Sequence, residues 1–317
     1  MTLSLELGSS HIKVYCETQG IIFYEPTLLV AKFKNNRPTL VSFGKSAYDM
    51  SDNLNDDEQL VSPIRNGVIT NFKCAKLLLD AVFETLIGNK NKRKAVELVF
   101  CVPSCATSVQ VDEYIKLLNS CGISAITIRR QLTCIARLLD TTDSKPYLIV
   151  DIGAGKTEIG LTTTSKLIDA ISLSLGGELI DLSLYEILKH TYNISTPYEE
   201  ITKVKETIAS LYATDATTTN VYAQNLEDNT WNNYVISSQD IYDALVICYD
   251  KIIEGIKVFI STLDDEHQKI VTNTGIFFSG LGCEIIGFEK YVQSKFNDIN
   301  IYLLDTPATA VIEGAIN

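Results

Sequence analysis

Two short stretches of this chain have the residue types and spacing that suit phosphate binding. The first reads Glu6-Leu7-Gly8-Ser9-Ser10-His11-Ile12-Lys13, and the second reads Asp151-Ile152-Gly153-Ala154-Gly155-Lys156-Thr157-Glu158. In each, an acidic residue ends an apolar run and small residues follow it. Small residues let the backbone approach a ligand closely and present its N–H groups to phosphate. These stretches, here named the first and second glycine hairpins, predict one phosphorylated ligand clamped between two similar halves.

The elements that must position the hairpins follow a repeated order. Strands are expected over residues 2–7, 13–18 and 21–24 around the first hairpin, and over 147–150, 159–163 and 167–173 around the second. Residues 98–102 form an apolar run that ends at Pro103 and is typical of a buried strand. A helix over 109–119, capped by Thr107, and a strand over 125–128 follow. This β-α-β order predicts parallel pairing.

Further helices are predicted on both sides of the second hairpin. Residues 71–87 form an amphipathic helix, and Thr196-Pro197-Tyr198-Glu199 has the pattern of a capping box that starts a helix reaching about residue 211. The polar segment 214–233 indicates short strands or loops of a small subdomain. Ser238 is expected to cap a long helix to about residue 263. A strand over 276–278 leads into Ser279-Gly280-Leu281-Gly282, here named the third glycine turn.

Length and composition narrow the class of protein. A chain of 317 residues is too long for one ordinary core and suits two domains. A net charge of −12 argues against nucleic acid as the main partner, and the one basic run, residues 90–94, is expected to be a solvated loop. No stretch approaches the ~20 apolar residues of a membrane span, and no signal peptide is expected. The cysteines lie mostly in apolar segments, which indicates buried reduced thiols in a cytoplasmic protein.

Seven segments in order, from residue 3 to residue 316, resemble the actin superfamily, and within it bacterial MreB most of all. Besides the two hairpins, the resemblance rests on residues 20–27, 63–71, 102–107, 175–178 and 305–311. It implies an α/β, actin-like ATPase fold with two ribonuclease-H-like domains around a nucleotide cleft. The expected domains are residues 1–150 and 151–317, the second with a small insertion around 180–240. It also implies self-assembly into filaments.

The same resemblance implies a site for ATP or ADP with Mg²⁺. Its nucleotide-binding residues would be Gly8, Ser9, Ser10, Lys13, Gly153, Ala154, Gly155, Lys156, Gly177, Lys205, Glu206, Gly280, Leu281 and Gly282. Lys13 falls where actin contacts phosphate, and Lys205 and Glu206 fall where actin holds the adenosine. Glu6 and Asp151 would hold the metal through its waters.

Four departures from the family pattern all fall on this site. Glu6 stands where the first loop normally has aspartate, which shifts a carboxylate near a metal that requires near-octahedral geometry. Ala154 and Lys156 replace glycine and threonine, and Leu281 replaces a glycine of the adenosine turn. The Glu-Pro pair whose glutamate orients the attacking water in MreB is replaced by Arg130-Gln131.

Two of these residues remain open on sequence grounds. Gln131 either aligns the attacking water, as a glutamine does in actin, or caps the helix that follows it. Because phosphoryl transfer depends on positioning and charge, the loss of the glutamate predicts slow hydrolysis at most, and Gln131→Glu is expected to raise it if nucleotide and metal are well placed. Lys156 is either an ordinary surface lysine or a charge supplied to the phosphate pocket.

The leading interpretation is therefore a divergent MreB-like cytoskeletal protein that binds adenine nucleotide, polymerises and hydrolyses ATP weakly or not at all. The alternative is a nucleotide-free pseudo-actin that caps or regulates filaments of another MreB. A sugar or acetate kinase is disfavoured because the chain lacks the large substrate insertions of such enzymes. Expected partners are the chain itself and other MreB-like proteins, with no nucleic acid and no direct membrane insertion.

Overall fold

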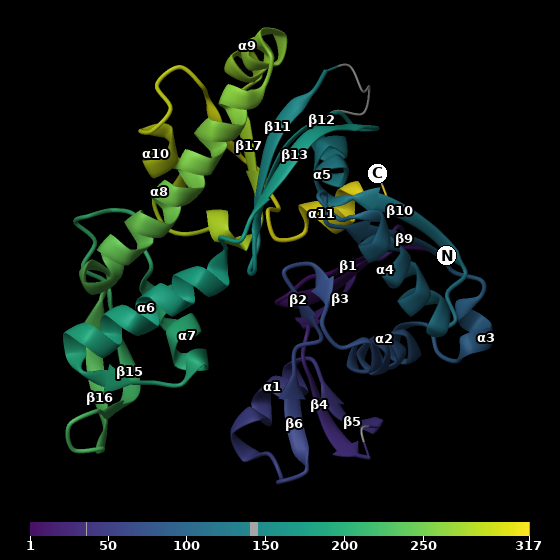
Figure 1. Cartoon of the computed structure of the whole chain (residues 1–317), viewed down its shortest axis with the longest axis horizontal. Helices are drawn as coiled ribbons and strands as arrows, with labels where there is room; N and C mark the ends of the chain where they lie inside the picture. Colours follow the sequence, from purple (N-terminus) through teal and green to yellow (C-terminus); the bar gives the residue numbers. More distant parts are fainter. Residues whose placement is uncertain (36, 140–144, 317) are drawn as a thin grey trace. The chain divides into compact units, whose positions relative to one another are not determined.

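The computed structural model of the chain describes residues 1–35, 37–139 and 145–316 (Figure 1). The chain divides into two compact units. The first comprises the described residues of Met1–Pro146, Gly160–Ala170 and Thr309–Asn317, and the second comprises Tyr147–Ile159 and Ile171–Ala308.

A five-stranded sheet in the order β10-β9-β1-β2-β3 carries the first glycine hairpin. Its strands are β1 (Thr2–Leu7), β2 (His11–Cys16), β3 (Gly20–Pro26), β9 (Glu97–Val102) and β10 (Ala125–Arg130). β1 pairs antiparallel with β2, whereas β9 pairs in parallel with both β1 and β10. The parallel pairing confirms the expectation from the β-α-β order, and it places the ends of β1 and β10 at one edge of the sheet.

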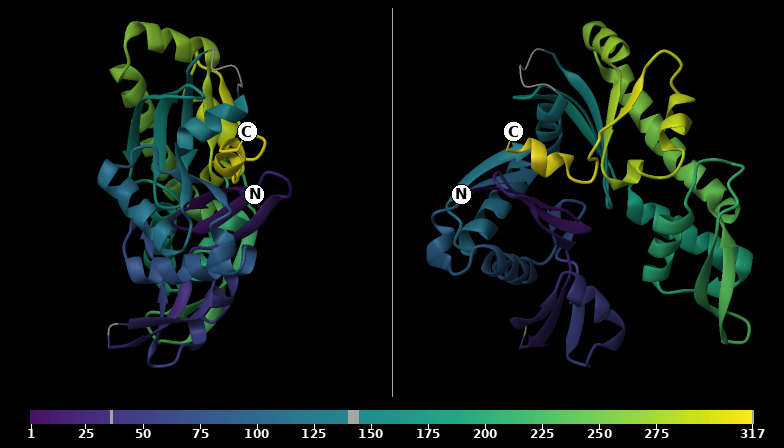
Figure 2. Two further views of the ribbon diagram at one scale, coloured as in Figure 1. Left: turned by 90° about the vertical axis from the view of Figure 1, so that its right-hand side faces the viewer. Right: turned by 180° about the vertical axis from the view of Figure 1, so that it is seen from behind.

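Helices cover this sheet. They are α2 (Phe72–Leu86), α4 (Ser108–Ser120), α5 (Gln131–Leu139) and α11 (Ala310–Gly314). Of these, α2, α4 and α5 each have one apolar face. Residues such as Leu78 and Val82 of α2 share one core with Leu3 and Leu5 of β1 and Leu117 of α4. The C-terminal helix α11, drawn in yellow, packs against β1 and β2 and against α5, as Figures 1 and 2 show. The Ser4 hydroxyl in β1 donates to Ile312 O at 2.6 Å and fixes this contact.

The rest of the first unit consists of short elements. A three-stranded sheet has the order β5-β4-β6, and β7 pairs with β8. These elements are β4 (Leu29–Lys34), β5 (Arg37–Phe43), β6 (Glu58–Val61), β7 (Ile64–Arg65), β8 (Val68–Ile69), α1 (Lys45–Asp49), the 3₁₀ turn η1 (Ser51–Asn53) and α3 (Lys90–Arg93).

A second five-stranded sheet, in the order β13-β12-β11-β17-β18, carries the second glycine hairpin and the third glycine turn. Its strands are β11 (Tyr147–Ile152), β12 (Thr157–Thr162), β13 (Leu167–Leu173), β17 (Ile276–Ser279) and β18 (Ile301–Leu303). β17 pairs in parallel with β11 and β18, so Asp151 at the end of β11 stands opposite Ser279. The repeated hairpins thus correspond to two sheets of equal strand number.

The second unit also contains the polar segment of the chain. A three-stranded sheet in the order β14-β15-β16 is formed by β14 (Ile194–Ser195), β15 (Thr218–Asn225) and β16 (Trp231–Ser237). Its helices are α6 (Gly177–Tyr192), α7 (Tyr198–Ile208), α8 (Ser238–Thr262), α9 (Asp265–Thr274), α10 (Phe288–Gln293) and the 3₁₀ turn η2 (Leu281–Cys283). No helix in the described part of the chain is both long and apolar enough to cross a membrane.

Three local predictions need correction. The Thr196 hydroxyl donates to Tyr222 O of β15 at 3.2 Å instead of capping α7, whose N-cap is Pro197. Ser237, not Ser238, caps α8, because Asp240 three residues after Ser237 completes a capping box with it. By contrast, Thr107 caps α4 as predicted, in a capping box with Gln110.

The third correction concerns the basic run, which is not simply a solvated loop. Residues 90–93 form the short helix α3, and the Arg93 side chain is only 3% exposed. Its guanidinium donates to Asp80, to Glu84 and to the carbonyl oxygens of Gly88, Cys121 and Asp80. Arg93 therefore joins α2, α3 and the end of α4. The cysteines are free thiols, and all but the exposed Cys105 are buried.

Candidate functional site

The first glycine hairpin has a turn that only glycine can begin. The Gly8 N–H donates to His11 O at 3.0 Å, and a Cβ on Gly8 would lie 2.9 Å from that oxygen. The turn is also held from outside, since Ser9 Oγ accepts from Asn66 N at 2.8 Å and Ser10 O accepts from Thr27 N at 2.8 Å. The hairpin is therefore a fixed turn with small side chains.

A cluster of three polar side chains lies at the base of this hairpin. Glu6 Oε2 accepts from Lys13 Nζ at 3.1 Å, and Glu6 Oε1 accepts from Gln131 Nε2 at 3.1 Å. Glu6 is 8% exposed and Gln131 is 7% exposed. The parallel order β10-β9-β1 brings the end of β10, where Gln131 begins α5, to the end of β1. The sheet thus brings the amide of Gln131, which is remote in sequence, to the carboxylate and the ammonium group of the first hairpin.

The structure distinguishes Gln131 from its neighbour Arg130. The Arg130 guanidinium donates to Ser104 O and, at 3.2 Å, to Ala106 O, so it holds the loop between β9 and α4. Gln131 instead directs its side chain at Glu6. Among the described residues, its amide group donates to Glu6 and does not cap a helix. Of the two residues, Gln131 is therefore the one whose side chain lies beside the first hairpin.

His11 adds a neutral group to the first hairpin. Its Nδ1 lies 2.8 Å from Ser10 Oγ, and its ring packs edge-on against Tyr24 with centroids 5.0 Å apart. Burial, together with the nearby Lys13 charge, lowers the pKa of His11 to about 4. His11 is consequently uncharged near neutral pH, and Lys13 is the cation of the hairpin.

The second glycine hairpin supports the start of α6. The Gly153 N–H donates to Lys156 O at 2.9 Å and closes the turn. Its outer carbonyls then accept from the first N–H groups of the helix: Gly177 N donates to Gly153 O at 3.1 Å, and Glu178 N donates to Ala154 O at 2.8 Å. Otherwise unpaired helix N–H groups thereby find acceptors. A Cβ on Gly176 would lie 2.5 Å from Ala154 O, so this packing requires glycine there.

Lys156 is not an ordinary surface lysine, the first of the two alternatives that the sequence left open. Its Nζ lies 2.8 Å from Glu158 Oε1, and the two side chains are 16% and 1% exposed. A buried carboxylate is costly unless it is paired, so Glu158 fixes the lysine. Lys156 is thus held in an ion pair within the second hairpin, as Lys13 is held by Glu6 in the first.

Lys205 belongs to a second buried cluster. Its Nζ lies 2.7 Å from Asp181 Oδ1 and donates to Gly177 O at 3.2 Å. The other oxygen of the buried Asp181 accepts from Tyr198 OH at 3.0 Å and from Thr202 Oγ1 at 3.3 Å. Burial and the Asp181 charge raise the pKa of Tyr198. This cluster ties α7 to the first turns of α6, while Glu206 is exposed.

The third glycine turn packs directly on the end of β11. Gly280 has φ 85° and ψ 154°, and a Cβ there would lie 2.3 Å from Ile152 O and 2.8 Å from Asp151 Oδ1. A Cβ on Gly282 would lie 2.2 Å from Ile152 Cγ2. Tyr249 OH of α8 donates to Gly282 O at 2.6 Å. Leu281 between the two glycines is 43% exposed. Asp151 and the third glycine turn therefore form one surface of the second unit.

Three residues of these clusters escaped the sequence interpretation: Glu158, Asp181 and Tyr249. Glu158 carries a signal that could have been used, since an acidic residue inside an otherwise apolar strand needs a partner, and Lys156 two residues away lies on the same face. Asp181 and Tyr249 lie in helices with ordinary amphipathic patterns. Nothing in their neighbourhood singles them out.

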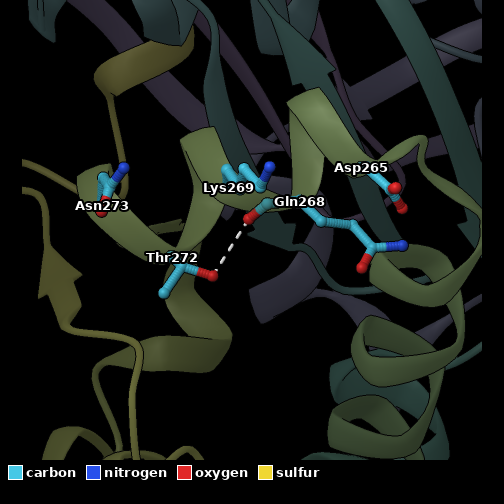
Figure 3. A pocket seen from close by; sticks show the side chains of 5 residues that line it. All are labelled: Asp265, Gln268, Lys269, Thr272 and Asn273. Atoms are coloured by element: carbon cyan, nitrogen blue, oxygen red, sulfur yellow. Dashed lines mark hydrogen bonds between the residues drawn. The ribbon is translucent and has the colours of Figure 1, made fainter.

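A separate surface hollow lies on α9 (Figure 3). Its volume is about 290 Å³, and its lining residues are Asp265, Gln268, Lys269, Thr272 and Asn273. The Thr272 hydroxyl donates back to Gln268 O of its own helix. All lining residues come from one helix, whereas ligand sites gather polar groups from several elements. The hollow contains none of the residues that the hairpins bring together.

The sequence matches a family model and known relatives over nearly its whole length. The sequence model of the family described as "MreB/Mbl protein" matches residues 1–317. The cell shape-determining protein MreB of Pasteurella multocida is 21% identical over 321 residues, covering 98% of this chain and 91% of the relative. The cell shape-determining protein Mbl of Bacillus subtilis is 18% identical over 316 residues, covering 98% and 93%.

Comparison with solved structures shows the fold. A crystal structure of MreB5 of Spiroplasma citri bound to ADP aligns with a TM-score of 0.90 and 24% identity, covering 99% of this chain and 94% of that one. A MamK double helical filament aligns with a TM-score of 0.80 and 21% identity, covering 100% and 98%. The fold is that of these actin-like ATPases, with two sheet-and-helix domains, as predicted from the sequence.

Proposed function

This chain belongs to the MreB/Mbl family, and we propose that it is a cytoskeletal protein that binds adenine nucleotide with Mg²⁺ and polymerises into filaments. Hydrolysis of ATP in this proposal is slow at most. The observation that carries the proposal is the Glu6–Lys13–Gln131 cluster at the base of the first glycine hairpin, because it combines a cation for phosphate with an amide that can orient water. The expected location is the cytoplasm, and the expected process is the control of cell shape or internal organisation.

The comparisons support nucleotide binding and assembly by analogy. MreB5 of Spiroplasma citri was crystallised with ADP and with AMPPNP, and MamK forms a double helical filament. In this chain Gly8, Ser9, Ser10 and Lys13 would bind phosphate from the first domain, residues 1–150. Gly153, Ala154 and Gly155 would do so from the second, residues 151–317. Gly177, Lys205, Glu206, Gly280, Leu281 and Gly282 would surround the adenosine. The chain itself is the proposed partner, together with other MreB-like proteins.

The acidic groups present fit a metal held through its waters. Mg²⁺ keeps most of its water shell in proteins and takes one or two carboxylates. Asp151 stands at the end of β11, beside Gly280. Both oxygens of Glu6 already accept one hydrogen bond, from Lys13 and Gln131, and each keeps a second lone pair for a metal-bound water. Bound Mg²⁺ would supply positive charge for the phosphates.

Replacing Asp151 with alanine is expected to weaken nucleotide binding about 10–100-fold in Mg²⁺, because an outer-shell carboxylate of the metal is lost. Without Mg²⁺ the affinities of variant and wild type should be similar. Titration of a fluorescent ATP analogue with Mg²⁺ or with EDTA measures both. Asp169→Ala removes an exposed carboxylate of β13 and is the matched control. Equal weakening in Mg²⁺ and in EDTA would show that Asp151 acts on the fold and not on the metal.

Assembly is expected to respond to salt. At a net charge of −12 the subunits repel one another, and raising the salt from ~10 mM to ~150 mM shortens the screening length from ~30 Å to ~8 Å. We therefore expect the critical concentration for assembly with Mg²⁺-ATP to fall over this range, measured by light scattering and pelleting. Sucrose at matched osmolality controls for non-ionic effects. Scattering that stays flat at all protein concentrations, nucleotides and salts contradicts self-assembly.

One observation favours the second candidate, a nucleotide-free pseudo-actin that caps or regulates another MreB. Leu281 places an exposed apolar side chain in the third glycine turn, beside the surface that Asp151 shares. If Leu281 blocks the adenosine, Leu281→Gly will create nucleotide binding that the wild type lacks. Saturable binding by the wild type excludes this candidate.

A further inference from the structure

The Glu6 carboxylate lies between two donors, and this arrangement gives a role to a residue that departs from the family pattern. Resting on the proposed function, we infer that Glu6 is a positioning residue that holds the Gln131 amide with its oxygen turned toward the attacking water. Glu6 Oε1 accepts from Gln131 Nε2 at 3.1 Å, and Glu6 Oε2 accepts from Lys13 Nζ at 3.1 Å. All three residues belong to the first unit.

The chemistry of the contact fixes which end of the amide faces Glu6. A carboxylate paired with an ammonium group accepts hydrogen bonds and donates none. Gln131 must therefore turn its NH₂ group to Glu6, and its oxygen Oε1 points away from the carboxylate. Within the described residues, Gln131 Oε1 has no hydrogen-bond partner, although the side chain is only 7% exposed. The free acceptor is the group that a water-orienting residue needs.

The length of the Glu6 side chain is what makes the double contact. An aspartate at this position would be shorter by one carbon–carbon bond, about 1.5 Å. The two hydrogen bonds are 3.1 Å long, and hydrogen bonds weaken steeply beyond about 3.5 Å. The shorter carboxylate could not reach Lys13 and Gln131 together without a backbone shift. The glutamate at residue 6 and the glutamine at residue 131 therefore form a matched pair.

The contact changes the expectation for Gln131→Glu. On its own, this variant would place two carboxylates at hydrogen-bond distance, and one of them would be forced to stay protonated or to move away. Glu6→Gln on its own would give its oxygen to Lys13 and its NH₂ group to Gln131, whose amide would have to turn its oxygen inward. Combining Glu6→Gln with Gln131→Glu restores a donor at residue 6 and an acceptor at residue 131, with one carboxylate oxygen left for the water.

The contact itself is tested on nucleotide-free protein. Unfolding of the wild type, the two single variants and the double variant forms a double-mutant cycle. We expect the two sites to be coupled, with an interaction that changes the unfolding equilibrium about tenfold in favour of the double variant. Glu17→Gln, an exposed carboxylate of the turn after β2, is the control and should not couple to Gln131→Glu. Additive effects of Glu6→Gln and Gln131→Glu would overturn the inference.

The positioning role is tested by single-turnover hydrolysis of ATP and by the affinity for a fluorescent ADP analogue, measured on the same four proteins. Each single variant should lower turnover about 10–100-fold, whereas the double variant should be faster than either single variant. A purely structural Glu6 that only supports Lys13 would leave the double variant as slow as Glu6→Gln. If the wild type binds no nucleotide, the proposed function fails and the positioning role with it. Binding without hydrolysis would contradict the positioning role alone.

Discussion

Replacing Gly280 with alanine is expected to destabilise the second unit by about 3 kcal/mol or more and to weaken nucleotide binding. Gly280 combines φ 85° with ψ 154°, a region that side chains other than glycine avoid. Its new Cβ would lie 2.3 Å from Ile152 O, a backbone atom that cannot turn aside, and 2.8 Å from Asp151 Oδ1. The third glycine turn would have to move away from β11. Thermal and urea unfolding and nucleotide titration measure the two effects.

Gly20→Ala is the matched control for this variant. Gly20 also has a positive φ, 75°, but a Cβ there would meet no atom within 4 Å. The backbone penalty for alanine at positive φ is about 1–2 kcal/mol, with no steric clash added, and nucleotide affinity should not change. If the two variants lose equal stability, the close approach of Gly280 to Ile152 does not make this position more sensitive than Gly20, and the expectation is wrong.

Replacing Arg93 with alanine is expected to lower the free energy of unfolding by about 3–5 kcal/mol. The guanidinium is 3% exposed and pairs with Asp80 at 2.8 Å and Glu84 at 2.8 Å, so its removal leaves Asp80 and three carbonyl oxygens without their donor. The neighbouring Lys76 would compensate only in part, through Asp80. Urea unfolding of the purified variant gives the value.

Lys94→Ala is the control, because Lys94 belongs to the same basic run and is exposed. Substitutions at exposed positions away from such networks change stability by roughly 0.5 kcal/mol or less. Arg93→Lys should fall between the two, since lysine keeps the charge but not the planar array of donors. If Arg93→Ala and Lys94→Ala are equally stable, the hydrogen bonds of Arg93 add no stability and the basic run behaves as a solvated loop.

The sequence predicted those elements whose signals are local. Apolar periodicity and single capping residues gave α2, α4 and the strands around both hairpins. Local predictions failed where a side chain bonds to a residue that is distant in the sequence. Thr196 has the right neighbours for a capping box, yet its hydroxyl is used by Tyr222 O of β15. Arg93 looks like any charge of a solvated run until Asp80 and Glu84 of α2 are placed next to it.

The candidate site divides in the same way. The hairpin turns are encoded by neighbouring residues, so Gly8 and Gly153 could be recognised directly. The contact between Glu6 and Gln131 joins residues 125 positions apart, and it depends on β9 lying between β1 and β10. A single sequence contains no signal for the contact between Glu6 and Gln131. The sequence could therefore identify Glu6 as a departure from the family pattern, but not the partner that accounts for it.

The central claim, that this member of the MreB/Mbl family binds adenine nucleotide through the two glycine hairpins, is tested most directly by titrating the wild-type protein with a fluorescent ATP analogue in Mg²⁺ and in EDTA. We predict saturable binding with one nucleotide per chain, weaker in EDTA and displaced by unlabelled ADP. Absence of saturable binding in both conditions, with a protein that unfolds cooperatively, would contradict the claim and favour the pseudo-actin.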